Sequence, residues 1–177
     1  MEIYEKSNAR MEFINGEVVM MSSPSMEHQQ TLGDLYMLFK QFFKGKPCQP
    51  FLAPLDIHFY KKDIRDPDVM QPDLVVICDA GEKTNAKGRY MGTPALTLEI
   101  LSPGTRSIDL VYKLNTFMMS GVGEYWLVDP QNRHIILYRF EDLPIVEYAT
   151  VRKGEVAKSW AFDGLQVAVD ELWTSFG

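Results

Sequence analysis

Two short, almost uninterrupted apolar segments near the middle of the chain constrain its fold more than any other feature. Residues 74–78 read LVVIC and follow Pro72 and Asp73, and residues 95–101 read ALTLEIL. Runs of this length without regular polar alternation are typical of strands that are covered on both faces. We therefore predict two central strands of a sheet. Each brings a carboxylate with it, Asp73 at the start of the first and Glu99 inside the second.

The residues before these strands predict a hairpin, a helix and a further strand. Asn15-Gly16 stands between two apolar runs within residues 12–20, which is a strong signal for a tight hairpin turn. Ser23-Pro24 predicts the start of a helix that ends at Gly45 and Pro47. Its apolar stripe is formed by Leu32, Leu35, Tyr36, Phe39, Phe42 and Phe43. Strict alternation over residues 51–59 predicts one half-buried strand.

The second half of the chain continues the mixture of helices and strands. Residues 102–105 (SPGT) end the second apolar strand and predict a helix whose stripe is Leu110, Leu114, Phe117 and Met118. Further strands are predicted over residues 124–129, 134–140 and 145–151, and residues 79–94 predict a mobile loop. Asp170 predicts the cap of a short C-terminal helix bearing Leu172, Trp173 and Phe176. This order of elements predicts an α/β or α+β fold.

Length and composition limit the organisation and the partners of the chain. With 177 residues, and domains of about 100 to 150 residues being typical, we expect a single domain over residues 1–177, with a core at 12–140 and C-terminal strands and a short helix at 141–177. Hydrophobic residues make up 46% and charged residues 24%, as in ordinary globular proteins. The formal net charge of -6 excludes a protein that binds nucleic acid through its overall charge, so any contact with nucleic acid must be made by a local group of residues.

The cysteines and the N-terminus bear on the expected compartment. Cys48 and Cys78 are 30 residues apart with no CxxC pair, so we expect neither a disulfide nor a cysteine-rich zinc site, and interpret both as small core residues. The start MEIYEKSNAR is charged and leads into no apolar run, which is unlike a secretory signal. No window approaches the roughly 18 apolar residues of a membrane span. We expect a cytoplasmic protein with no membrane partner.

Asp73 and Glu99 are the strongest candidates for chemistry. An ionised carboxylate in an apolar segment costs several kcal/mol unless it is paired or binds a metal. If the two strands are neighbours, the carboxylates converge on a hard divalent cation, magnesium or manganese rather than zinc. The alternatives remain open: Asp73 as a residue of a strand-opening turn after proline, and Glu99 with a buried partner such as Arg106 or Lys113.

Three further residues have both a structural and a functional interpretation. Asp109 and Lys113 are spaced i, i+4 in the order that favours an intrahelical ion pair, which is most often a solvated surface pair. The helix follows the Glu99 strand directly, so Lys113 can instead point a cation at the carboxylates. His28 shares the apolar stripe of the first helix, where a histidine is more often a core or cap residue than a ligand.

Several segments together resemble a known family. EFINGEVVMMSSPSMEHQ, APLDIHF, QPDLVVI, LTLEILSPGTRSIDLVYKL and SGVGEYWLVDP, from about Glu12 to Pro130, are similar to the Uma-type family of restriction-endonuclease-like proteins, inside the PD-(D/E)XK nuclease superfamily. The resemblance implies a restriction-endonuclease-like fold, with a mixed β-sheet flanked by helices. It also implies hydrolysis of phosphodiester bonds with a divalent metal.

Residue by residue, the resemblance makes Asp73 the aspartate of the PD element and Glu99 the acidic residue of the second element, which together hold the metal. The lysine expected two residues after the second acid is absent, since Leu101 stands there, and Lys113 is the natural substitute. Glu17 and His28 resemble further motif positions, and Asp109 is a possible accessory residue.

The resulting hypothesis is a nuclease that uses Mg²⁺ (or Mn²⁺), acts on nucleic acid, DNA in the first place, and forms a homodimer. A small basic rim that contacts nucleic acid could be formed by Lys61, Lys62, Arg65, Lys83, Lys87 and Arg89. The same residues can equally form an ordinary solvated surface. The competing hypothesis is a noncatalytic binding or assembly module with a nuclease-like core, and Leu101 in the lysine position favours it. Hydrolysis of a smaller phosphodiester is a third possibility.

Overall fold

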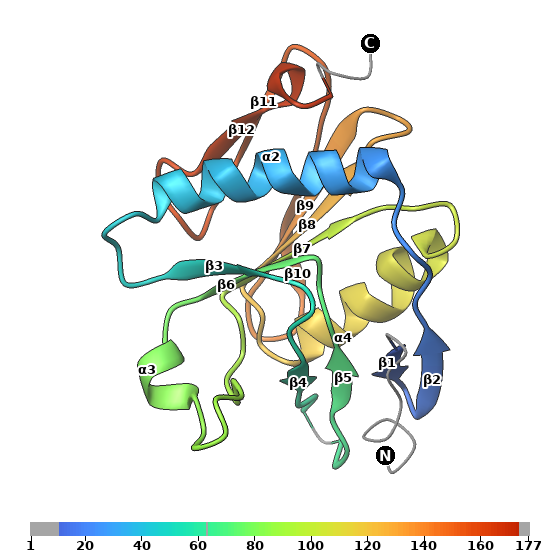
Figure 1. Cartoon of the computed structure of the whole chain (residues 1–177), viewed down its shortest axis with the longest axis vertical. Coiled ribbons are helices and arrows are strands. Elements are labelled where there is room, and N and C mark those ends of the chain that lie inside the picture. The colour runs from blue at the N-terminus through green and yellow to red at the C-terminus, as the bar shows by residue number, and fades with distance from the viewer. Residues whose placement is uncertain (1–10, 63, 174–177) are drawn as a thin grey trace.

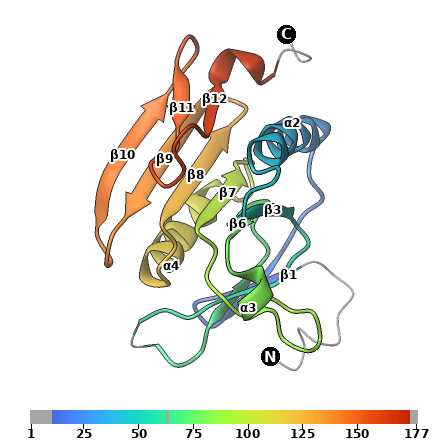
Figure 2. The same cartoon turned by 90° about the vertical axis from the view of Figure 1, so that its left-hand side faces the viewer.

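A mixed six-stranded sheet forms the centre of the computed structural model, which describes residues 11–62 and 64–173 (Figures 1 and 2). The strand order is β10-β9-β8-β7-β6-β3, and all neighbours are antiparallel except β7 and β8. The strands are β3 (Gln49–Leu52), β6 (Leu74–Ile77), β7 (Leu96–Ile100), β8 (Glu124–Asp129), β9 (His134–Phe140) and β10 (Ile145–Val151). The two predicted central strands are β6 and β7, and they are neighbours.

Both faces of the sheet are covered, which explains the uninterrupted apolar segments. Side chains alternate between two hydrophobic cores: Leu74 and Val76 belong to one, and Val75 and Ile77 to the other. Helix α2 (Met26–Phe42) packs in the first core and the helix after β7 in the second, on the two sides visible in Figure 2. A strand between two cores has no solvated face, so its sequence shows no polar alternation.

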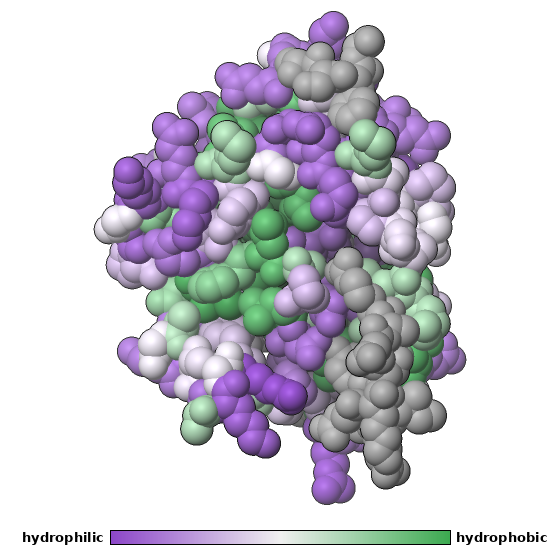
Figure 3. Space-filling view, in the orientation of Figure 1, coloured by the Kyte–Doolittle hydropathy of each residue, from purple (hydrophilic) through white to green (hydrophobic). Residues whose placement is uncertain are grey.

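Helix α2 buries the predicted stripe but begins later than predicted. Leu35 and Phe39 are fully buried, and the ring of Phe39 lies edge-on to Trp126 of β8 at 5.7 Å. The N-cap is Ser25, whose hydroxyl accepts a hydrogen bond from the backbone N–H of His28 at 3.1 Å, so the predicted cap at Ser23 is wrong by two residues. Hydrophilic side chains cover most of the outer surface of α2, and hydrophobic ones reach the surface below it, over β3 (Figure 3).

The second helix contains an unusual segment. Residues 108–113 form a π-helical stretch, η1 (Ile108–Lys113), which runs directly into α4 (Leu114–Met119). Such wider turns inside helices frequently occur at functional sites. Phe117 is fully buried, and the other predicted stripe residues pack partly buried on the second core. The segment also buries Asp109 and Lys113, so the interpretation of this pair as a solvated surface pair is wrong.

The N-terminal hairpin belongs to a second, four-stranded sheet of order β2-β1-β5-β4. Its strands are β1 (Met11–Ile14), β2 (Glu17–Met20), β4 (Ile57–Phe59) and β5 (Asp68–Met70). Asn15 and Gly16 have φ values of 50° and 86°, so the predicted hairpin turn is confirmed. The predicted strand over residues 51–59 is wrong: β3 and β4 lie in different sheets, because Pro54 lacks the N–H that an unbroken ladder needs.

The remaining elements are short. A single helical turn, α3 (Ala80–Lys83), lies within the predicted loop 79–94. A hairpin of β11 (Val156–Lys158) and β12 (Gln166–Ala168) precedes a 3-10 turn, η2 (Val169–Glu171), which replaces the predicted C-terminal helix. The cap position of that turn is Ala168 rather than Asp170. Leu172 and Trp173 are buried, and Phe176 lies outside the described residues.

Cys48 and Cys78 form a disulfide with an S–S distance of 2.10 Å, which overturns the expectation of two reduced core cysteines. The antiparallel register of β3 and β6 pairs Gln49 with Ile77, so the next residue out on each strand is a cysteine. Cys78 is exposed rather than in the core. In the part of the chain that the structure covers, we find no helix with both the length and the apolarity to cross a membrane.

Candidate active site

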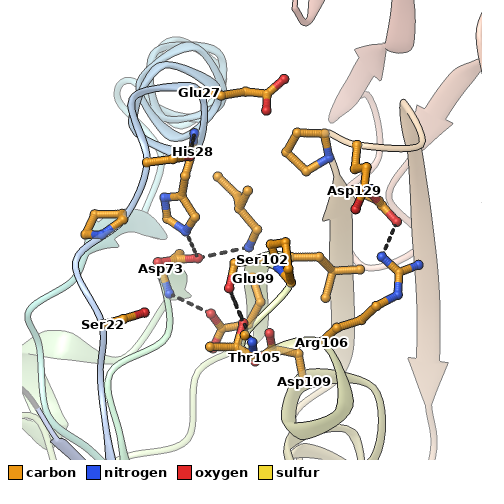
Figure 4. A pocket seen from close by; sticks show the side chains of 18 of the residues that line it. Ser22, Glu27, His28, Asp73, Glu99, Ser102, Thr105, Arg106, Asp109 and Asp129 are labelled. Atoms are coloured by element: carbon orange, nitrogen blue, oxygen red, sulfur yellow. Dashed lines mark hydrogen bonds and ion pairs between the residues drawn. The ribbon is translucent and has the colours of Figure 1, made fainter.

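A pocket of about 440 Å³ opens where the first turn of α2, the end of β7 and the turn after β8 meet (Figure 4). Residues 21–25, 27 and 28 form one wall, residues 99–106 the floor and residues 129–131 the opposite wall. The side chains of five predicted residues line it: His28, Asp73, Glu99, Asp109 and Lys113. Glu17, the sixth predicted residue, is exposed on β2 and does not line this pocket.

Strand register brings Asp73 and Glu99 together. Leu74 pairs with Leu98 in the antiparallel ladder of β6 and β7, so Asp73, one residue earlier, lies opposite Glu99. The backbone N–H of Asp73 donates to Glu99 Oε2 at 3.4 Å, and the N–H of Ile100 donates to Asp73 Oδ2 at 2.9 Å. The structure therefore gives Asp73 more than the role of a turn residue, since its carboxylate faces the same pocket as Glu99.

Lys113 reaches the carboxylates from the π-helical segment. Its Nζ lies 2.7 Å from Glu99 Oε1, 3.1 Å from Glu12 Oε2 and 3.4 Å from Asp109 Oδ1, and the residue is 2% exposed. Of the two partners considered for Glu99, the structure selects Lys113. Arg106 instead pairs with Asp129 at 2.7 Å, on the far side of the pocket.

Glu12 is a residue of this site that sequence reasoning missed. It lies in β1, is 1% exposed, and accepts a hydrogen bond from the backbone N–H of Gln71 at 2.9 Å as well as contacting Lys113. The available signal was a glutamate between Met11 and Phe13 in a short apolar strand. The hairpin therefore does supply an acidic residue to the site, at Glu12 on its first strand rather than at Glu17 on its second.

His28 faces the pocket rather than the core. Its Nε2 lies 3.1 Å from Asp73 Oδ2, while Nδ1 is buried and has no hydrogen-bond partner among the described residues. The cap of α2 fixes this position, because the same residue donates its backbone N–H to Ser25. The histidine thus holds one oxygen of Asp73, and the interpretation as a core or cap residue does not account for this contact.

The acidic side chains of the site form a cluster, which we call the acidic cluster: Glu12, Asp73, Glu99 and Asp109. Burial raises the pKa of Glu99 well above its ordinary value of 4.5, and although Lys113 acts to lower it, the neighbouring carboxylates act in the same direction as burial. Burial likewise raises the pKa of Asp109. Burial opposes the ionisation of Asp73, yet its pKa is lowered, because the hydrogen bond and charge of His28 and the N–H of Ile100 outweigh it.

The acidic side chains of the acidic cluster outnumber its cationic partners. Burial opposes the charge on Lys113, but the surrounding carboxylates raise its pKa well above 10.5 and keep it protonated. One ammonium and one imidazole then face four acidic side chains, and a bound cation would favour the ionised forms of Glu99 and Asp109, which burial disfavours. Within residues 11–62 and 64–173, no group of three or more His, Cys, Asp or Glu side chains is arranged to hold a metal ion.

The basic rim predicted for the pocket is absent from its lining. None of the six candidates lines the pocket. Lys61 is 5% exposed and its Nζ is bound to Asp68 Oδ2 at 2.8 Å and to Asn15 Oδ1 at 2.7 Å. The other five residues are exposed, as in an ordinary solvated surface. The sequence did not predict that Lys61 is buried in an ion pair, because its partner Asp68 becomes its neighbour only in the folded sheet.

Comparison with known proteins identifies relatives along nearly the whole chain. Residues 1–170 match the model of the Uma2 family, which is described as "Putative restriction endonuclease". The uncharacterized protein slr1290 of Synechocystis sp. is 24% identical over 173 residues, which is 96% of this chain and 86% of that relative.

A solved structure shares the fold. The crystal structure of a "putative nuclease belonging to DUF820" from Anabaena variabilis superposes with a TM-score of 0.76 at 20% sequence identity, covering 94% of this chain and 90% of the other. The predicted fold class, a mixed sheet flanked by helices, is thereby confirmed.

Proposed function

The chain belongs to the Uma2 family, and on that premise we propose that it is a nuclease that hydrolyses phosphodiester bonds in nucleic acid with the help of a divalent cation. The observation that carries the proposal is the approach of two buried carboxylates, Asp73 and Glu99, on neighbouring strands at the edge of a pocket. We propose Mg²⁺, or Mn²⁺, as the ion, held by these two residues.

The donors of the pocket fit such an ion. Mg²⁺ prefers oxygen ligands, binds through only one or two carboxylates and retains several waters, so it needs no third protein side chain. A bound cation would offset the effect of burial on Glu99 and Asp109, whose pKa values are raised, and would favour their ionised forms. When bound, the ion would polarise the scissile phosphate and lower the pKa of a coordinated water.

Lys113 is proposed to replace the lysine that the family motif would place at position 101. Leu101 there is apolar and 6% exposed, whereas the Lys113 ammonium lies 2.7 Å from Glu99 on the pocket side of the helix. A fixed ammonium in a site with little water stabilises negative charge that develops on a phosphate. In this proposal His28 orients Asp73, and Glu12 and Asp109 hold Lys113 in position.

We propose DNA as the substrate and a homodimer as the assembly, and we propose the cytoplasm as the location although a disulfide such as Cys48–Cys78 is uncommon there. The net charge of -6 requires that contacts to DNA be local to the pocket. Light scattering tests the assembly, since a dimer has twice the chain mass of 20.3 kDa. Cell fractionation tests the location.

The test of the function is cleavage of single- and double-stranded DNA and RNA with Mg²⁺ or Mn²⁺, and with EDTA. We expect cleavage with the metal and none with EDTA. Asp73→Asn and Glu99→Gln keep the shape of each side chain and should abolish cleavage. Glu82→Gln on α3, exposed and outside the pocket, is the matched control and should cleave as the native protein does.

Leu101 in the lysine position supports one alternative, a noncatalytic binding module with a nuclease-like core. Calorimetry with MgCl₂ and MnCl₂ on the native protein and on Asp73→Ala separates the two. Metal binding that Asp73→Ala removes supports the nuclease. No metal binding by the native protein, together with no cleavage of any substrate, supports the module.

A further inference from the structure

Arg106 is a cation of the candidate active site to which the proposed function gives no role. Its side chain lines the pocket and is 39% exposed, whereas the side chain of Lys113 is 3% exposed and already contacts carboxylates. Within the described residues, Asp129 is the one partner of the Arg106 guanidinium, whose Nη1 donates to Asp129 Oδ2 at 2.7 Å. A guanidinium is always charged and has several N–H donors, so Arg106 retains donors for a ligand in the pocket.

Asp129 fixes the position of the guanidinium. It ends β8, its side chain is fully buried, and its two oxygens accept hydrogen bonds from the backbone and the side chain of Asn132 at 3.0 and 2.8 Å. Burial opposes the ionisation of Asp129, yet its pKa is lowered, because the bonds from Asn132 and Arg106 outweigh burial. Figure 4 shows that Arg106 reaches toward this anchored carboxylate on the side of the pocket opposite His28 and Asp73.

The position of Arg106 in its helix also favours an anionic ligand. The helical segment of residues 106–119 begins at this residue, and the partial positive charge at the start of a helix disfavours a basic side chain. An anion, by contrast, is favoured there both by the backbone and by the guanidinium, which binds phosphate oxygens through two parallel N–H bonds. A phosphate group is therefore the ligand that suits this part of the pocket.

The pocket consequently has two parts of opposite character. One contains the carboxylates of Asp73 and Glu99, where the proposed function places the divalent cation. The other contains Arg106 and the hydroxyls of Ser102 and Thr105, which lie 2.9 Å apart. A volume of about 440 Å³ is typical of sites for ligands larger than a single phosphate. Since nucleic acid carries a phosphate at every nucleotide, a strand can occupy both parts at once.

We propose that Arg106 binds the phosphate next to the scissile one, so that the site selects a nucleic-acid strand over a phosphodiester that has a single phosphate. This inference rests on the proposed function, in which the scissile phosphate lies at the cation. Asp129 is a positioning residue, since it acts only by holding the guanidinium. No bond is made or broken at Arg106, so its contribution is to substrate binding rather than to the chemical step.

Cleavage kinetics of Arg106→Gln on DNA with Mg²⁺ test this role. Loss of one charged contact to phosphate should raise KM by about 10-fold or more, with a smaller change in kcat. The slope of log(kcat/KM) against the logarithm of the KCl concentration should become shallower by about 1, which loss of a merely structural ion pair would not cause. Arg152→Gln, exposed and outside the pocket, is the matched control and should keep the native KM and slope.

A comparison of two short substrates on the native protein needs no variant. The thymidine trinucleotide TpTpT has two phosphates and the dinucleotide TpT has one. The native protein should cleave TpTpT with a kcat/KM about 10-fold higher or more, and Arg106→Gln should reduce this preference. If Arg106 only supported the fold, its replacement would lower kcat/KM for both substrates equally.

The failure of this inference is distinguishable from the failure of the proposed function. A folded Arg106→Gln with native KM and salt dependence overturns the role of Arg106 while DNA cleavage by the native protein still stands. Equal kcat/KM of the native protein for TpTpT and TpT does the same. If the native protein cleaves no nucleic acid with Mg²⁺ or Mn²⁺, the proposed function fails and this inference fails with it.

Discussion

Replacing Lys113 by methionine removes the ammonium that contacts the acidic cluster and keeps most of the volume of the side chain. In the structure that ammonium contacts Glu12, Glu99 and Asp109 at 2.7 to 3.4 Å, and all three carboxylates are less than 5% exposed. Removing one partner from a buried ion pair leaves uncompensated charge and costs about 3 to 5 kcal/mol. For a chain of this size that corresponds to a fall in Tm of about 6 to 20 °C.

The cost of Lys113→Met should depend on pH. Without the ammonium the pKa of Glu99, already raised above 4.5, rises further, so the folded protein binds more protons than the unfolded one. The stability deficit of the variant is then smaller at pH 5 than at pH 8. If cleavage is established for the native protein, turnover should also fall by about 100-fold or more, as on loss of one fixed electrostatic contact.

Urea unfolding followed by circular dichroism at both pH values measures this deficit, with the exposed Lys83→Met as control. The control should change the free energy of unfolding by less than about 0.5 kcal/mol. A loss of only about 0.5 kcal/mol in Lys113→Met would show that the lysine behaves as a surface residue, contrary to the contacts described. Unchanged cleavage in that variant would remove Lys113 from the proposed mechanism.

Three further predictions concern the same fold. Glu99→Gln removes a carboxyl whose ionisation burial opposes, so the free energy of unfolding of the variant relative to that of the native protein should be higher at pH 8 than at pH 4.5 in urea unfolding; a difference that is the same at both pH values would contradict this. Lys61→Met leaves Asp68 buried without its cation and should cost about 3 to 5 kcal/mol in urea unfolding, whereas the exposed neighbour Lys62→Met should cost less than about 0.5 kcal/mol. Reduction of the Cys48–Cys78 bond should lower the free energy of unfolding by about 2 to 4 kcal/mol, and a Cys48→Ala, Cys78→Ala double variant should not respond to reductant; equal stability of the oxidised and reduced native protein would disprove the bond's contribution.

Local patterns in the sequence were sufficient for much of the fold. The two apolar segments predicted β6 and β7 because a strand between two cores loses its polar alternation. Asn15-Gly16 predicted the hairpin because both residues adopt positive φ at low cost. The stripe of α2 followed from helical periodicity. In each case the pattern that carries the prediction lies within a short stretch of the chain.

The sequence also identified most of the candidate site. Asp73 and Glu99 were conspicuous because a carboxylate in an apolar segment needs compensation, and the structure supplies it through His28 and Lys113. Which of two possible cations pairs with Glu99 was not determined by spacing. Arg106 and Lys113 lie on one continuous helical segment that begins at residue 106, just before η1, and the packing of that segment against the sheet directs only Lys113 inward.

Contacts between distant segments depended on the tertiary structure. The choice of Glu12 over Glu17, the burial of Lys61 against Asp68, the disulfide of Cys48 and Cys78, and the break at Pro54 all depend on which strands become neighbours and in which register. A shift of one residue in register moves every side chain to the other face of a strand. Local propensity does not fix that register, because it is set by packing the two sheets and both cores together.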